Sequence, residues 1–224
     1  MTSEKHTNRL PPITAESPTG NRPPVINYAD ITVGDPNPIK RRLQRLRLRH
    51  ALRGLPDVEA SFSGKVLDYG AGNGELAKHL RRRFPHAEIV CYEPAPMLRE
   101  QAEENLRGLS GISILDNLAD LAPASFGFIF CLEVFEHLPD PQTEHAFQEF
   151  RRLTAPDAHI IIGVPNEIFL AGLIKGAFRI SRRYGEYDAT VSNVLRAALG
   201  KPPRNRPVVS LQGLPYITRH MGFD

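Results

Sequence analysis

A loop with glycine at every second position carries the residue pattern with the clearest chemical meaning in this chain. The segment 68–74 (DYGAGNG) follows a short apolar run and precedes a helical pattern. Its three glycines let the backbone turn sharply and let a ligand approach where a Cβ atom would collide. The dinucleotide fingerprint G-x-G-x-x-G binds a pyrophosphate, but here an acidic residue, Asp68, stands two positions before the first of three alternating glycines. We therefore expect a nucleoside ligand that carries positive charge rather than a pyrophosphate.

Glu93, at the end of the next predicted strand, is the second acidic residue of this candidate site. A carboxylate at this position can accept hydrogen bonds from both hydroxyl groups of a ribose, as in other nucleotide-binding α/β folds. Alternatively, it complements the N-terminal dipole of the helix that is predicted to follow. The sequence P-A-P-M-L directly after Glu93 favours the ribose role.

Strand and helix patterns alternate from residue 64 onward, which predicts an α/β fold with a doubly wound, mostly parallel sheet. Apolar runs predict strands over 65–69, 88–92, 112–115, 126–132 and 159–164. Helical spacing predicts helices over 75–83, 94–106, 138–153, 168–183 and 191–199. Open sheets of this kind bind nucleotides at the carboxyl ends of their strands, so we expect Asp68 and Glu93 to face a common cleft there.

The segment 66–77 (VLDYGAGNGELA) resembles motif I of the class I S-adenosylmethionine (AdoMet) methyltransferases, and the resemblance covers residues 60–170. It implies a Rossmann-like fold, methyltransferase activity and S-adenosyl-L-methionine as the cofactor. The family places a polar side chain and a backbone amide after the third strand, against the edge of the adenine ring. An ordinary turn at Asp116 and Asn117 is the alternative. The cofactor-binding residues that the resemblance implies are Asp68, Gly70, Ala71, Gly72, Gly74, Glu93, Pro94, Asp116, Asn117, Leu118 and Leu132.

The string 133–138 (EVFEHL), after the fourth predicted strand, resembles the ubiquinone-biosynthesis O-methyltransferases and the methyltransferases of small-RNA 3′ ends. In the RNA group such a string binds a divalent cation, and Glu133, Glu136 and His137 match it. That group completes its site with a His-rich loop beyond the fifth strand, which this sequence does not contain, so no metal is predicted. We expect Glu133 and His137 to be the catalytic residues, with His137 as general base because its ordinary pKa lies near neutrality.

The chain is expected to contain four regions. Residues 1–37 form a Pro-rich leader that is predicted to be disordered, and residues 38–56 form a basic amphipathic helix with seven Lys and Arg residues and no acid. The AdoMet-binding domain is expected over 57–166, followed by a helical cap and C-terminal extension over 167–224. In the family a Gly-Phe pair like that at 222–223 opens strand 6, so the sheet is expected to lack strands 6 and 7, and the chain is either a fragment or a short member.

The segments 39–55 and 168–183 combine apolar residues with basic ones. They suit peripheral contact with an anionic membrane, or with an amphiphilic or anionic substrate such as a lipid, an isoprenoid-linked ring or a glycan. The alternatives are a solvated charged face on the first helix, and a second helix that simply covers the sheet.

Composition narrows the class of protein further. The chain has 224 residues, of which 41% are hydrophobic and 24% charged, with a formal net charge of +3, so overall charge does not indicate nucleic-acid binding. Both cysteines, Cys91 and Cys131, lie in apolar runs, which indicates reduced thiols and excludes a disulfide framework. No apolar run approaches the roughly 20 residues that span a bilayer, and the N-terminus has no hydrophobic signal core, so a cytoplasmic location is expected.

Three functions remain from the sequence. The first is AdoMet-dependent methyl transfer, to oxygen, on a small-molecule, lipid or glycan acceptor. The second is an RNA-directed methyltransferase, which the basic clusters favour but the missing His-rich loop and the few aromatic residues for base stacking disfavour. The third is a non-catalytic nucleotide-binding or NAD-dependent protein, and the glycine spacing argues against NAD.

Overall fold

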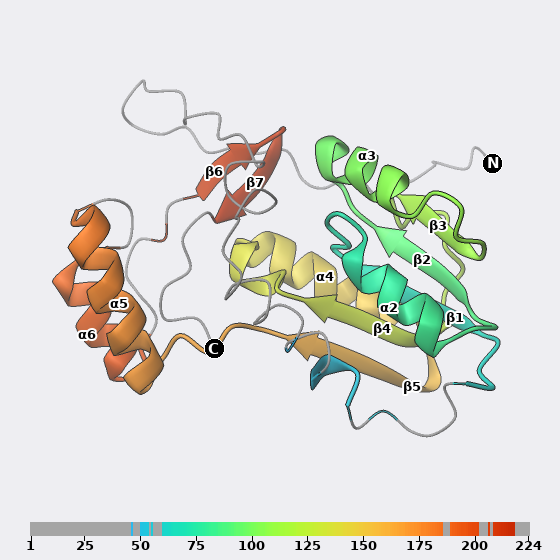
Figure 1. The fold of residues 1–224 in the computed structure, drawn as a ribbon, viewed down its shortest axis with the longest axis horizontal. Coiled ribbons are helices and arrows are strands. Elements are labelled where there is room, and N and C mark those ends of the chain that lie inside the picture. Colours follow the sequence, from blue (N-terminus) through green and yellow to red (C-terminus); the bar gives the residue numbers. More distant parts are fainter. Residues whose placement is uncertain are drawn as a thin grey trace, which may run out of the picture. The chain divides into compact units, whose positions relative to one another are not determined.

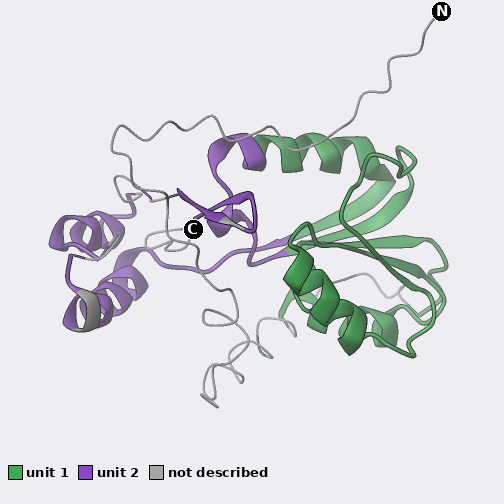
Figure 2. Cartoon of the chain, turned by 90° about the horizontal axis from the view of Figure 1, so that it is seen from above, with its two compact units in different colours: residues 1–21, 37–131, 144–161 green, residues 22–36, 132–143, 162–224 purple. Residues whose placement is uncertain are grey.

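The computed structural model describes residues 46, 50–53, 55, 60–185, 189–201, 206 and 208–217. The predicted leader over 1–37 and most of the predicted basic helix lie outside these residues. The described chain divides into two compact units, shown in Figure 2. The first contains the residues up to 131 together with 144–161, and the second contains 132–143 and the residues from 162 onward.

The central element is a five-stranded sheet with the strand order β3-β2-β1-β4-β5 (Figure 1). β1 pairs in parallel with β2 and with β4, and β2 pairs in parallel with β3. The order therefore reverses at β1, which is the topological switch point where open α/β sheets bind ligands. The strands are β1 (Lys65–Tyr69), β2 (Glu88–Tyr92), β3 (Ile112–Leu115), β4 (Phe126–Leu132) and β5 (Thr154–Gly163). The predicted doubly wound sheet is confirmed.

Helices cover both faces of this sheet. α2 and α3 lie on one face, and α4 lies on the other (Figures 1 and 2). Their bounds are α2 (Glu75–Arg83), α3 (Pro96–Asn105) and α4 (Asp140–Leu153), within two residues of the predicted ranges. The sequence predicted that this strand begins near residue 159, because the residues around Pro156 are typical of a turn. In the structure β5 begins earlier, at Thr154. This edge strand accommodates the proline and an Asp157 with φ of 59°.

Aromatic side chains fill the core on both faces. On the first, Phe84, at the end of α2, packs against Phe128 and Phe130 of β4 at ring-centroid distances of 4.9 and 6.3 Å. On the second, Tyr69 of β1 packs edge-to-face against Phe150 of α4 at 5.0 Å. These close aromatic pairs hold α2 against β4, and α4 against β1, the strand that carries Asp68.

The second unit contains the short helix η2 (Phe135–His137), the helices α5 (Phe169–Arg183) and α6 (Val191–Ala198), and the strands β6 (Val208–Leu211) and β7 (Leu214–Ile217). α5 approaches α6 closely at Gly176, where an added Cβ atom would lie 2.5 Å from a methyl group of Val194. β6 and β7 form a separate antiparallel sheet. Among the described residues, the parallel sheet gains no sixth or seventh strand from this region.

The β6–β7 hairpin is absent from the sequence prediction. Its two-residue turn, Gln212-Gly213, has positive φ at both positions (52° and 88°), as hairpin turns of type I′ require. A polar residue followed by glycine between two apolar runs was the signal that could have identified it.

Candidate active site

The glycine loop connects β1 directly to α2. Gly70, Gly72 and Gly74 all have positive φ, at 76°, 56° and 80°. The amides of Gly70 and Ala71 donate to the carbonyl oxygen of Tyr92 at 2.8 and 3.0 Å, which ties the loop to the end of β2. A Cβ atom on Gly74 would lie 2.8 Å from Leu106, whereas one on Gly72 would meet no described atom within 4 Å. Gly74 is therefore needed for packing as well as for its backbone angle, and the space beside Gly72 is open to a ligand.

Asp68 is a buried carboxylate at the end of β1. Its side chain is 2% exposed, and its Oδ2 atom has no hydrogen-bond partner among the residues that the structure describes. Burial, and secondarily the nearby charge of Glu93, raises the pKa of Asp68 from 3.8 to about 7. A buried oxygen that lacks a donor fits a cationic group of a ligand, because such a group would favour the ionised carboxylate.

Glu93 meets the glycine loop from the end of β2. Its Oε2 accepts a hydrogen bond from the amide of Gly72 at 2.8 Å, and its Oε1 accepts one from the amide of Ala95 at 2.9 Å. Burial raises the pKa of Glu93 to about 7, although the two amides and Arg99 oppose this change. Asp68 and Glu93 thus lie close enough, at the ends of β1 and β2, for their two carboxyl groups to repel each other when both are ionised.

The segment after β3 is adjacent to Glu93, whose amide donates to the carbonyl of Leu115 at 2.9 Å. Asp116 is exposed and faces Arg99 at 3.6 Å. The Oδ1 atom of Asn117 accepts from the amide of Ala119 at 2.9 Å, so this oxygen forms the local turn that was the alternative to an adenine contact. Leu118 is buried.

Arg99 was not identified from the sequence. Its Nη1 atom donates to the carbonyl oxygens of Glu93 and Pro94 at 3.1 and 3.4 Å, and its Nη2 atom faces Asp116. It therefore links the ends of β2 and β3 from α3. A single arginine on a helix gives no sequence signal for such a role, since its partners are backbone carbonyls.

His137 lies in the second unit, in η2, and contacts β7. Its Nδ1 atom lies 2.9 Å from the carbonyl oxygen of Ile217, and its ring stacks on Tyr216 with centroids 4.5 Å apart. A carbonyl oxygen can only accept, so Nδ1 carries the proton and Nε2 the lone pair. Burial lowers the pKa of His137 from 6.5 to about 4, which keeps the imidazole neutral at pH 7.

Glu133 and Leu132 also belong to the second unit. Glu133 adopts φ of 58°, which is uncommon for a residue with a side chain, and its amide donates to the carbonyl of Gly163 at 2.7 Å. A Cβ atom on Gly163 would lie 2.7 Å from Leu132, so these two chain segments pack closely. No cluster of three or more His, Cys, Asp or Glu side chains that could hold a metal ion occurs in the described part of the chain.

Two basic side chains of α5 form ion pairs with the buried carboxylate of Glu167. Lys175 and Arg179 approach the carboxylate oxygens of Glu167 at 2.9 and 3.6 Å. Asn166, beside it, accepts from the amide of Ile168 at 3.4 Å and so takes part in the local turn. None of the helices in the described ranges is long and apolar enough to cross a membrane.

Comparison with known proteins agrees with this geometry. A family model for the methyltransferase domain matches residues 36–198. The ubiquinone biosynthesis O-methyltransferase of Hahella chejuensis is 32% identical over 118 residues, which are 49% of this chain and 47% of that protein. The protein of the same name from Vibrio atlanticus is 28% identical over 186 residues, which are 78% of this chain and 75% of that protein. The chain thus spans about half the length of some of the curated relatives that it matches.

A solved structure with the same fold is the PH0226 protein of Pyrococcus horikoshii. It superimposes with a TM-score of 0.53 at 20% identity, covering 69% of this chain and 72% of the other. The family match extends over most of the chain, including the glycine loop, both buried carboxylates and the string with His137. The chain therefore belongs to the methyltransferase domain family, within the class I S-adenosyl-L-methionine-dependent methyltransferases.

Proposed function

We propose that this chain transfers a methyl group from S-adenosyl-L-methionine to an oxygen atom of a small-molecule, lipid or glycan acceptor. The observation that carries the proposal is the pair of buried carboxylates, Asp68 and Glu93, beside an open glycine loop at the switch point of the sheet. The relatives named ubiquinone biosynthesis O-methyltransferase support oxygen as the acceptor atom.

The described residues fit this cofactor. Asp68 would face its cationic methionine end, because its Oδ2 atom is buried and lacks a donor among the described residues. Glu93 would bind the ribose hydroxyls, and the loop 70–74 would allow close approach of the ligand. The segment 116–118 would lie along the adenine edge. When bound, AdoMet supplies a methyl carbon activated by positively charged sulfur, so the protein mainly has to align the reactants.

We assign proton removal from the acceptor hydroxyl to His137. The Ile217 carbonyl fixes the tautomer with the lone pair on Nε2, and the ring of Tyr216 restricts rotation of the imidazole. A neutral imidazole can accept a proton. Its lowered pKa differs from the near-neutral value expected from the sequence: it keeps the ring neutral down to acidic pH but makes it a weaker base. Glu133 is the second catalytic candidate, on the turn that precedes η2.

A peripheral membrane contact through α5 is also part of the proposal. Large apolar side chains are exposed on this helix, with Phe169 at 59%, Leu170 at 69% and Ile174 at 62%. Exposed apolar patches of this kind mark interaction surfaces. Since Lys175 and Arg179 are paired with Glu167, we expect apolar insertion to contribute more to this contact than charge attraction. A cytoplasmic location is proposed as well, supported by the two buried free cysteines.

Calorimetry followed by product detection tests the proposed reaction. The protein is titrated with AdoMet, S-adenosylhomocysteine and NAD, and then incubated with labelled AdoMet and a panel of amphiphilic phenols, lipids, glycans and RNA. Binding of the two adenosyl ligands but not of NAD, with label recovered on an oxygen atom, is the expected result. Binding of NAD in place of AdoMet, or label recovered on RNA alone, would contradict the proposal.

A further inference from the structure

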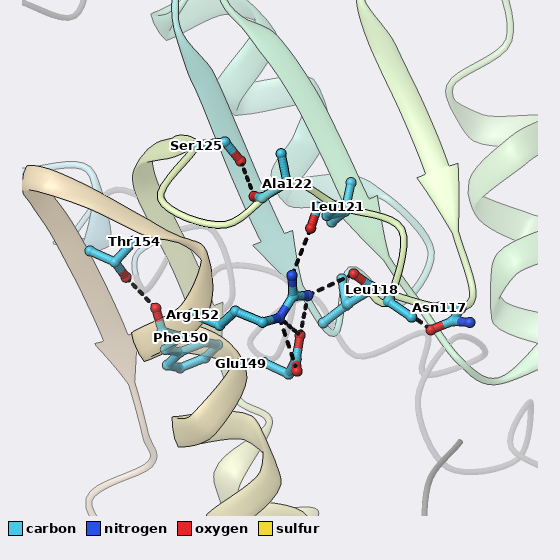
Figure 3. Close-up of polar contacts among 10 residues, drawn as sticks. Asn117, Leu118, Leu121, Ala122, Ser125, Glu149, Phe150, Arg152 and Thr154 are labelled. Carbon is cyan, nitrogen blue, oxygen red and sulfur yellow. Dashed lines mark hydrogen bonds and ion pairs between the residues drawn. The ribbon is translucent and has the colours of Figure 1, made fainter. Parts of the chain in front are cut away.

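Arg152, in the last turn of α4, ties the loop between β3 and β4 to that helix (Figure 3). Its Nη1 atom donates to the carbonyl oxygen of Leu121 at 2.6 Å, and its Nη2 atom donates to that of Leu118 at 2.7 Å. The same guanidinium pairs with the buried carboxylate of Glu149, with 2.6 Å between Nη2 and Oε2. The planar, five-donor fork of arginine can hold a carboxylate and two carbonyls at the same time.

The loop makes further bonds to the end of the helix. The amides of Ala124 and Ser125 donate to the carbonyls of Arg152 and Leu153 at 2.8 and 3.0 Å. The carbonyl oxygen of Leu118 receives two donors, the amide of Leu121 at 3.0 Å and Arg152. The direction of the peptide group after Leu118 is therefore set both by the loop's own turn and by Arg152 from the helix. All of these residues belong to the first unit.

This loop follows the strand end next to Glu93. β3, β2 and β1 are neighbours and parallel, and the amide of Glu93 bonds to Leu115, one residue before the segment 116–118. A nucleoside with its ribose at Glu93 would extend its base along this segment. Connecting loops are mobile unless something holds them, and a loop that reads a base edge must keep its backbone groups in place.

We infer that Arg152, oriented by Glu149, is a positioning residue for recognition of the adenine base. It holds the backbone of 117–121 in the conformation that reads the base edge, and it acts through this loop. The inference rests on the proposed function, because it presupposes a nucleoside at Asp68 and Glu93. Its specific signature is base selectivity, since an arginine that only stabilised the fold would affect all ligands equally.

Calorimetry with two ligands that differ only at the base edge tests the inference. S-adenosylhomocysteine carries a 6-amino group, and S-inosylhomocysteine carries an oxo group in its place. We expect the wild-type protein to prefer the adenosyl ligand. In Arg152→Gln the affinity for that ligand should fall about 3- to 30-fold. The affinity for the inosyl ligand should fall much less, so the ratio of the two affinities should move toward one.

The adjacent Arg151 provides the matched control. It is exposed on the same helix turn, and Arg151→Gln should leave both affinities and their ratio unchanged. Arg152→Lys keeps the charge beside Glu149 without the fork and should give an intermediate ratio. If Arg152→Gln does not fold, Arg152→Lys and Glu149→Gln serve for the same comparison.

The outcomes separate this inference from the proposed function. Equal weakening of both ligands in the Arg152 variants, or a wild-type protein that binds both equally, would overturn the positioning role while leaving AdoMet binding intact. A wild-type protein that binds neither AdoMet nor S-adenosylhomocysteine would overturn the proposed function and, with it, this inference.

Discussion

At the level of single residues, the most unusual group is the Asp68 carboxylate, which is 2% exposed and has a raised pKa of about 7. Because the folded pKa exceeds the unfolded value of 3.8, ionisation of this side chain opposes folding as the pH rises through 7. A three-unit rise corresponds to at most about 4 kcal/mol, part of which arises from the coupling to Glu93. A group of this kind is costly for the empty site and useful for holding a cation.

Asp68→Asn should therefore separate stability from binding. At pH 8 we expect the variant without ligand to be more stable than the wild type, by about 1 to 3 kcal/mol, because the neutral amide avoids a buried charge. AdoMet affinity should fall by at least about tenfold, since the carboxylate that faces the cation is lost. Chemical denaturation and calorimetry measure the two effects. Glu100→Gln, at an exposed position of α3, should change neither, and an Asp68→Asn variant that binds AdoMet normally would refute the assignment.

His137 allows a second prediction at the same scale. His137→Ala should lower kcat by about 10²- to 10⁴-fold and leave AdoMet affinity unchanged, because the residue is assigned to the acceptor proton. Since the pKa of His137 is lowered to about 4, the acid limb of kcat at saturating AdoMet should lie well below pH 6 rather than near 6.5. Steady-state rates across pH 4–9 measure this. The exposed His86 provides the control, as His86→Ala, and equal loss of turnover and cofactor affinity in His137→Ala would indicate a structural role.

At the level of elements, the sequence predicted the alternating strands and helices well, because apolar spacing is a local property. The bounds of β1, α2, β2, β3 and β4 agree with the predicted ranges. The β6–β7 hairpin was missed because its strands are short and its turn residues are Gln212 and Gly213 rather than Asn-Gly. The acidic residues of the site follow from their positions at strand ends. The roles of Arg99 and Arg152 could not be predicted from the sequence, because they depend on carbonyl groups that only the folded chain brings within reach.

The exposed apolar face of α5 leads to a prediction for this element. Leu170→Glu and Ile174→Glu each place a charge on the face that we assign to the membrane contact, and they should reduce co-sedimentation with vesicles of phosphatidylcholine and phosphatidylglycerol several-fold. Gln148→Glu adds the same charge at an exposed position of α4 and should not reduce it. If all three variants sediment like the wild type, α5 does not contact the membrane.

For the whole molecule, three buried titratable groups among the described residues contribute to how stability depends on pH between about 4 and 8. Between about pH 4.5 and 6.5 the unfolded chain binds one extra proton at His137, whose folded pKa is lowered to about 4. The folded chain retains protons on Asp68 and Glu93, whose pKa values are raised to about 7. From these groups the folded state holds the larger number of protons, so its stability should fall as the pH rises and level off above about pH 8. This trend is opposite to that of proteins whose carboxylates are stabilised by ion pairs.

Binding of AdoMet should cancel this pH dependence and release protons in doing so. A positive ligand beside Asp68 and Glu93 lowers their pKa values again, so near pH 7 part of the protons on the pair should leave as the ligand binds. Affinity should therefore rise between pH 6 and 8.

Calorimetry at pH 7 in two buffers of different ionisation enthalpy measures the proton release directly. S-adenosylhomocysteine lacks the sulfonium charge and should release fewer protons than AdoMet. In Asp68→Asn the difference between the two ligands should shrink, because one of the two titrating groups is gone. Equal proton release by both ligands in the wild type would mean that the sulfonium does not lie near these carboxylates, even if both ligands bind tightly.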